Sequence, residues 1–82
     1  MKRNRHTIVT QILSICKKQS NKTRIVYQAN LNFNTVNPYL DLLIKNGLIE
    51  VKQGKTTLYE TTADGINLLD NFKEIDSQLA GL

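Results

Sequence analysis

Two amphipathic segments lie close together in this chain of 82 residues, with only a short polar turn between them. The first covers residues 23–29, and the second begins near residue 31 and ends at Gly47. Their apolar residues recur with the spacing of an α-helix, namely Ile25, Val26 and Ala29 in the first segment and Val36, Tyr39, Leu40 and Leu43 in the second. Helices joined by about 3–4 residues must pack against each other, which leaves few possible arrangements. Asn30 is the expected left-handed residue of the turn.

Further elements are predicted on both sides of this helix pair. A first helix is expected from about residue 6 to residue 18, on the apolar positions Ile8, Val9, Ile12, Leu13, Ile15 and Cys16. After the pair, Gly47 ends the second helix in the left-handed conformation. Residues 48–51 and 56–61 are rich in strand formers, and residues 52–55 form a turn between them. Helix, helix, turn, helix, hairpin is the order of a winged helix, so the predicted class is α+β and mostly helical.

A last helix is predicted over residues 62–82, with Thr62 as its N-cap and Asp64 in its first turn. Ile66 and Leu69 are expected to face the core of the chain. A second apolar set has the 4, 3, 4, 3 spacing of a coiled coil, namely Leu68, Phe72, Ile75, Leu79 and Leu82. This seam, which covers about two heptads, is the predicted dimer interface. The alternative is that it packs on the chain's own body.

Pro38 lies inside the second helical segment, where its missing amide hydrogen and its ring oppose a helix. The conflict disappears if the helix begins later, because first-turn amide groups have no helical partner. A regular helix is therefore predicted from about Thr35, capped by Asn34 or Thr35, with residues 32–34 as an extended turn. Leu42 is a second misfit, since it lies nearer the polar side of this helix. Contact with a neighbouring helix or a second chain would explain it.

Three stretches carry a family resemblance: KTRIVYQAN (22–30), YLDLLIKNGLI (39–49) and YETTADG (59–65). Through them, residues from about 7 to 72 resemble small archaeal winged helix-turn-helix DNA-binding proteins, which include chromatin-associated and regulator-like members. The resemblance implies double-stranded DNA as the partner and dimerisation through a C-terminal coiled-coil helix. The chain departs from the family at Pro38, where an ordinary helix former is expected, and its last helix is short for a long coiled coil.

Positive charge is concentrated in the part of the chain that precedes the last helix. Residues 1–59 carry ten Lys or Arg and two acids, whereas residues 60–82 carry one Lys and five acids. A basic body with an acidic tail indicates that the body meets a polyanion. The alternative is an ordinary solvated surface.

The second helix of the pair is the predicted recognition helix. When such a helix enters the major groove, its N-terminal residues reach the base edges. The expected contacts are Asn34, Thr35, Asn37, Asp41 and Lys45. Asn suits adenine, the Thr methyl suits thymine, and long basic residues for reading guanine are absent, so a modest preference for A·T-rich sites is expected. The alternative is that these Asn and Thr residues only cap the helix and fill the turn.

The phosphate backbone is expected to meet two further groups of residues. Gly54 is expected to permit the tight turn of the wing and a close approach. The predicted wing contacts are Lys52, Gln53, Gly54, Lys55 and Thr56. The predicted contacts of the N-terminal arm and its neighbours are Arg3, Arg5, Lys22 and Arg24.

Catalysis and cofactor binding are not indicated. One His and one Cys cannot assemble a zinc cluster within a chain, and no Gly-rich phosphate loop or nucleophile motif is present. We therefore expect no enzyme activity, no metal, no cofactor and no small-molecule ligand. No apolar run reaches the about 18–20 residues of a membrane span and no signal peptide is recognised, so a cytoplasmic, nucleoid-associated protein is expected. Cys16 is expected to be a buried core residue.

Together these patterns predict a winged helix-turn-helix DNA-binding domain in residues 1–61 and a dimerisation helix in residues 62–82. The predicted function is binding of double-stranded DNA as a dimer, either as a transcription regulator or as a chromatin-like architectural protein. The alternative is a protein-protein interaction module that uses the same fold without binding DNA.

Overall fold

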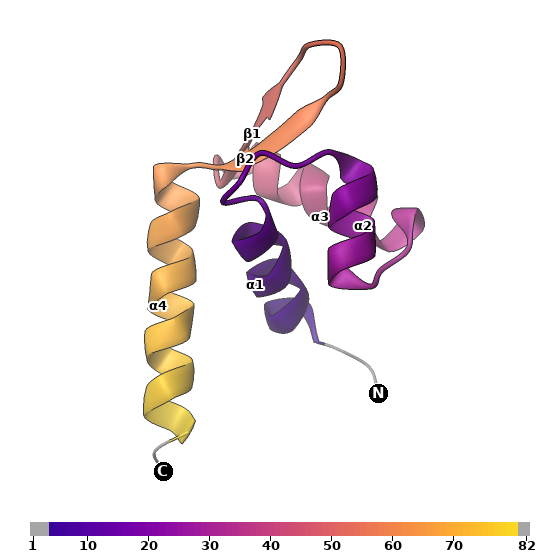
Figure 1. Cartoon of the computed structure of the whole chain (residues 1–82). Coiled ribbons are helices and arrows are strands. Elements are labelled where there is room, and N and C mark those ends of the chain that lie inside the picture. The colour runs from indigo at the N-terminus through magenta and orange to yellow at the C-terminus, as the bar shows by residue number, and fades with distance from the viewer. Residues whose placement is uncertain (1–3, 81–82) are drawn as a thin grey trace.

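The computed structural model describes residues 4–80, so Arg3 and Leu82 lie outside the described part of the chain. Within residues 4–80 the elements are α1 (Arg5–Ile15), α2 (Lys22–Ala29), α3 (Phe33–Lys45), β1 (Ile49–Lys52), β2 (Leu58–Thr61) and α4 (Ala63–Ala80). Figure 1 shows the hairpin projecting from a body of helices, with α4 running along one side of α1. This is the predicted order, and the α+β, mostly helical winged-helix class is confirmed.

Asparagine begins each of the first three helices. The side chains of Asn4, Asn21 and Asn32 accept a hydrogen bond of 2.8 Å from the amide three residues further on. Each bond satisfies one of the amide groups that a helix start leaves without a partner, which makes Asn one of the best N-caps. The cap at Asn32 places the start of α3 at Phe33. The three helices of the body are therefore delimited by local chemistry.

The predicted start of the recognition helix is wrong. α3 begins at Phe33, and Pro38 is its sixth residue rather than a first-turn residue. The side-chain cap of Asn32 favours the longer helix, and Val36 and Leu40 hold it against the core. Pro38 leaves the carbonyl of Asn34 without its helical donor, but both residues are exposed, so water can reach that carbonyl. Tertiary packing on the opposite face thus compensates for the proline.

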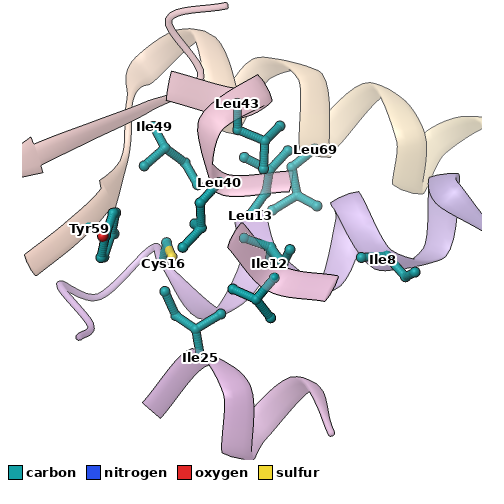
Figure 2. Close-up of a cluster of buried hydrophobic side chains, with 11 residues drawn as sticks. Ile8, Ile12, Leu13, Cys16, Ile25, Leu40, Leu43, Ile49, Tyr59 and Leu69 are labelled. Carbon is teal, nitrogen blue, oxygen red and sulfur yellow. The ribbon is translucent and has the colours of Figure 1, made fainter. Parts of the chain in front are cut away.

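The core is built from one face of every helix together with the hairpin. Figure 2 shows the side chains converging from α1, α3, β1 and α4, with Ile25 of α2 closing one side. The fully or almost fully buried apolar residues are Ile8, Ile12, Leu13, Cys16, Ile25, Ala29, Val36, Leu40, Leu43, Ile49, Tyr59 and Leu69. The predicted burial of Cys16 is confirmed. Burial in apolar surroundings raises the pKa of its thiol from 9.0 to about 12.

The hairpin is antiparallel, with Ile49 opposite Thr61 and Lys52 opposite Leu58. Ser20 adds a short bridge to β2, because its backbone exchanges hydrogen bonds of 3.0 and 2.8 Å with Tyr59. The hydroxyl of Thr61 donates a buried 2.7 Å bond to the carbonyl oxygen of Leu13. The base of the wing is therefore fixed to the end of α1.

Several boundaries and faces differ from the predictions. α1 ends at Ile15 with Cys16 as its C-cap, earlier than the predicted Lys18. Ile66 was expected in the core but is 37% exposed, whereas Leu69 is completely buried as predicted. Leu68 takes the place expected of Ile66, since it is half-buried against the core. The helix is thus rotated so that part of the predicted seam faces the chain's own body.

The left-handed turn residues agree with the sequence. Asn30 has φ 54° at the end of α2, and Gly47 has φ 73° after α3. Among the described residues, no helix combines the length and apolar character that crossing a membrane requires.

Candidate nucleic-acid interface

The outer face of α3 presents short polar side chains to solvent. Asn34 and Asp41 are exposed near its start and middle, and Lys45 is exposed in its last turn. The buried face of the same helix holds Val36 and Leu40 in the core, which fixes the helix on the body. This arrangement leaves an ordered polar ridge that a groove of DNA could accept.

Asn37 and Thr35 are less accessible than the sequence suggested. Both are half-buried on the flanks of the helix. The side-chain oxygen of Asn37 is buried and finds no hydrogen-bond partner among the described residues. Pairing with adenine needs both the oxygen and the nitrogen of the amide, so Asn34 is better placed for that contact than Asn37.

The wing carries Lys52 in an ion pair that the sequence did not indicate. Its Nζ lies 2.8 Å from the Oε1 of Glu60 on the opposite strand and 4.0 Å from the Oε1 of Glu50. The hydrogen bond that Lys52 donates to Glu60, aided by the charge of Glu60, raises the pKa of Lys52, and the same bond lowers the pKa of Glu60. Lys52 is therefore partly neutralised in the free protein.

The tip of the wing is exposed throughout. Gln53, Gly54, Lys55 and Thr56 are all accessible, and Lys55 makes no ion pair with any residue in the range 4–80. The predicted conformational need for glycine is wrong at Gly54: its φ is not left-handed, and an added Cβ would only touch the Thr56 carbonyl oxygen at 3.8 Å. Lys55 is thus the more available of the two predicted wing lysines.

Arg5 lies close to the recognition helix. A shallow cleft of about 350 Å³ is lined by Arg5 of α1 and by Pro38, Tyr39 and Leu42 of α3. The two misfits of the sequence, Pro38 and Leu42, therefore border the same cleft. Arg5 is the charged residue of this lining, which places one predicted backbone contact beside α3.

The remaining basic contacts come from α2. Arg24 is exposed and Lys22, the first helical residue, is half-buried. The first turn of α2, the helix before α3 in the pair, therefore carries two basic residues.

Phe33, which is not among the residues predicted to contact DNA, lies at the exposed head of α3. It is the first helical residue and is 46% exposed. Its position in the sequence could have indicated this exposure, because Phe33 stands between asparagines just before the apolar stripe of α3 begins.

The predicted seam of α4 is divided. Leu68 packs against the core, and the ring of Phe72 stands edge-on to the ring of His6 at a centroid distance of 4.5 Å. Beyond that contact, Ile75 and Leu79 are 50% and 60% exposed. The first half of the seam thus covers the chain's own body, and its second half is uncovered.

The described residues hold no group of three or more His, Cys, Asp or Glu side chains that could bind a metal. His6 has a single acidic neighbour, Asp76, whose Oδ2 lies 3.4 Å from its Nε2. This contact joins the start of α1 to the second half of α4, and both side chains are partly exposed.

Relatives and solved structures share this architecture. The chain is 36% identical over 75 residues to MJ0287, an uncharacterized protein of Methanocaldococcus jannaschii, a match that covers 90% of the chain and 74% of the relative. It is 34% identical over 76 residues to MJ0290 of the same organism, covering 92% of the chain but only 35% of that protein. Both relatives are archaeal, as the resemblance in the sequence implied.

Among solved structures, Sso10a-2, a DNA-binding protein from Sulfolobus solfataricus, matches with a TM-score of 0.88 and 29% identity over 96% of this chain and 84% of that one. ZitR of Lactococcus lactis, solved in complex with DNA, matches with a TM-score of 0.72 and 12% identity over 94% and 56% of the two chains, which supports the fold alone. A family model described as winged helix-turn-helix matches residues 2–80. The chain therefore belongs to the winged helix-turn-helix family.

Proposed function

We propose that the chain binds double-stranded DNA, with α3 in the major groove and the wing on the phosphate backbone. The observation that carries the proposal is the charge of the chain up to the middle of α3: no Asp or Glu precedes Asp41 in the sequence, while Lys and Arg are frequent there. Two further cations are accessible: Arg5 lies beside α3, and Lys55 lies at the tip of the wing. Sso10a-2 and ZitR, which share the fold, are a DNA-binding protein and a protein solved on DNA.

The proposed contacts follow from exposure. Asn34 at the head of α3 is the best candidate for a base contact, while Lys45 lies at its other end. Lys55 and Arg24 supply charge for phosphates, and these contacts carry most of the sequence-independent affinity. Because no exposed Arg stands on α3, we expect a modest preference for A·T-rich sites rather than guanine recognition.

We further propose that the chain acts as a dimer through the uncovered part of α4. Ile75 and Leu79 expose apolar surface at one end of a helix whose other end is fixed to the core by Leu69. Burying exposed apolar surface against an identical helix is favourable, and α4 reaches further than the neighbouring end of α1 (Figure 1). The division into a DNA-binding unit of residues 1–61 and a dimerisation helix of residues 62–82 stays part of this proposal.

A dimer that holds two recognition helices at a fixed separation suits a transcription regulator or an architectural protein on the nucleoid, which also implies a cytoplasmic location. The two roles differ in sequence preference. A regulator discriminates strongly between duplexes of different sequence, and an architectural protein binds them with similar affinity.

Fluorescence anisotropy with a labelled duplex at several salt concentrations tests the proposal. We expect binding whose log affinity falls linearly with log salt, by about 0.9 for each phosphate that the protein neutralises. Comparison of A·T-rich with G·C-rich duplexes then measures the sequence preference. If the folded protein binds no duplex even at low salt, the alternative of a protein-protein interaction module replaces DNA binding.

A further inference from the structure

Phe33 presents an aromatic ring to solvent at the head of α3. Phenylalanine is among the residues most often buried, and its neighbours along the helix follow that rule, since Val36 and Leu40 are completely or almost completely buried. Phe33 instead leaves 46% of its surface exposed. Its ring therefore contributes less to the core than its size would allow, and it is available to a partner.

The backbone that carries Phe33 is held in place on both sides. The side chain of Asn32 accepts the 2.8 Å hydrogen bond from the Thr35 amide, and its carbonyl accepts a 3.0 Å bond from the Val36 amide. Just before it, the Leu31 amide donates a 3.1 Å bond to the carbonyl oxygen of Val26. The ring is thus displayed by an ordered helix start and not by a loose loop.

The charge of this part of the chain favours one kind of partner. Lys22 and Arg24 lie on the preceding helix, and no acidic residue occurs in the first 40 positions of the sequence. An apolar protein surface would gain nothing from these cations. DNA, in contrast, offers phosphates for the cations and base edges for the ring. We therefore take DNA, and not a second protein, as the occupant of this surface.

One group on the base edges fits an aromatic side chain. The 5-methyl group of thymine is the apolar feature of the major groove, and phenylalanine is among the residues that contact it. Asn34, the next residue, is exposed and has the amide that suits adenine. Adjacent positions on α3 therefore match the two halves of A·T pairs.

We propose that Phe33 is a specificity-determining residue that packs on thymine methyl groups when α3 lies in the major groove. The inference rests on the proposed DNA binding and adds to it the chemical group that is read. It gives a structural cause for the preference for A·T-rich DNA, which would then depend on a methyl group as well as on hydrogen bonds.

The test compares two duplexes with the same alternating A·T sequence, one with thymine and one with uracil in its place, which lacks only the 5-methyl group. Thymine methyls occur in every register of such a duplex. We expect the wild-type protein to bind the uracil duplex about fourfold more weakly for each methyl contacted, the factor that corresponds to about 0.8 kcal/mol per buried methyl-sized group. The salt dependence should be the same for both duplexes, because no phosphate contact changes.

Phe33→Ala makes the assignment specific to this residue. The variant should bind the thymine and uracil duplexes equally, because the ring that distinguishes them is gone. Leu42→Ala is the matched control: Leu42 is exposed to a similar extent, 43%, but lies about 180° away around the same helix. This control should keep the full uracil penalty of the wild type.

Two results would overturn the inference while DNA binding stands: equal binding of both duplexes by the wild type, or an undiminished uracil penalty in Phe33→Ala. Absence of binding to either duplex by the folded wild type would overturn the proposed function and this inference with it. The base substitution leaves the protein unchanged, so the comparison is valid even if Phe33→Ala alters stability.

Discussion

The hydroxyl of Thr62 donates a hydrogen bond of 2.6 Å to the carbonyl oxygen of Gly47. Gly47 follows α3, and Thr62 immediately precedes α4. The same hydroxyl accepts a 3.1 Å bond from the Gly65 amide, and the Thr62 amide donates to the Leu48 carbonyl oxygen at 3.0 Å. The helix proposed to read DNA and the helix proposed to form the dimer are thus joined at one corner, which sets the direction of α4 relative to α3.

This corner predicts a strict requirement for glycine at position 65. A Cβ added to Gly65 would clash with the carbonyl oxygen of Leu48 and with the Thr61 side chain. Gly65→Ala should therefore lower the free energy of unfolding by about 1–3 kcal/mol, although alanine is the better helix former. Urea denaturation measures the change. Gly54→Ala is the control, because its Cβ has space, and it should stay within about 0.5 kcal/mol of wild type.

The two wing lysines should contribute unequally to DNA binding. Lys55→Ala should reduce the salt slope of the affinity by about 0.9, the amount for one phosphate contact. Lys52→Ala should reduce it less, because Glu60 already holds the Lys52 ammonium at 2.8 Å. Anisotropy at several salt concentrations measures both, with Lys73→Ala on α4 as the control. An equal loss in the two variants would mean that the Lys52–Glu60 pair opens on DNA.

Ile75 should be essential for association of two chains. Ile75→Asp places a charge on the uncovered part of the α4 seam, where desolvation on pairing is costly. Light scattering should give a mass near the 9.3 kDa of one chain for this variant and about twice that for the wild type. Ser77→Asp carries the same charge about 200° around the helix and should remain dimeric. A wild-type mass of one chain would reject the dimer.

Pro38 should lower the free energy of unfolding relative to alanine at the same position. Pro38→Ala restores the amide that can donate to the exposed Asn34 carbonyl, within a helix that is continuous from Phe33 to Lys45. Proline in a helix interior costs about 3 kcal/mol relative to alanine, and its restriction of the unfolded chain returns about 0.4–1 kcal/mol. We expect a net stabilisation of about 2–2.6 kcal/mol in urea denaturation. A destabilised variant would show that the proline ring contributes packing at the Arg5 cleft.

The thiol of Cys16 should be inert in the folded protein. Burial raises its pKa from 9.0 to about 12, so the native state keeps the proton at pH values where the unfolded chain loses it. The stability that the protonated Cys16 thiol contributes is fully present below pH 9 and is lost as the pH rises from there toward about 12. A thiol reagent at pH 8 should react only after urea is added. The stability of wild type should also fall more steeply above pH 9 than that of Cys16→Ala, and rapid native labelling would contradict the assignment.

The order of the elements and their turns was predictable because the signals are local. The apolar spacing of α1, α2 and α3 is a property of consecutive residues, and so are the left-handed conformations of Asn30 and Gly47. Thr62 was also recognised as the cap of α4 from its position before a helical pattern. Of the candidate interface, the exposed Asn34 and Lys45 of α3 and Lys55 of the wing follow from the same patterns.

The features that the sequence left open depend on residues that are distant along the chain. Glu60 neutralises Lys52 only because the strand register brings β1 and β2 together. Gly65 is required only because the Leu48 carbonyl lies against it. Ile66 and Leu68 exchange their expected roles because α1 determines which side of α4 is covered.

The sequence by itself determined a winged helix-turn-helix with a basic body, since helical and strand periodicity and charge are encoded residue by residue. Only the tertiary structure decided that α3 continues through Pro38, that Phe33 is exposed to solvent and that the seam of α4 is half covered. The physical reason is that packing free energy depends on which surfaces meet. The free energy gained by burying Val36, Leu40 and Leu43 outweighs the local cost of one proline. A pattern of neighbouring residues cannot show this balance, because it does not show which surfaces meet.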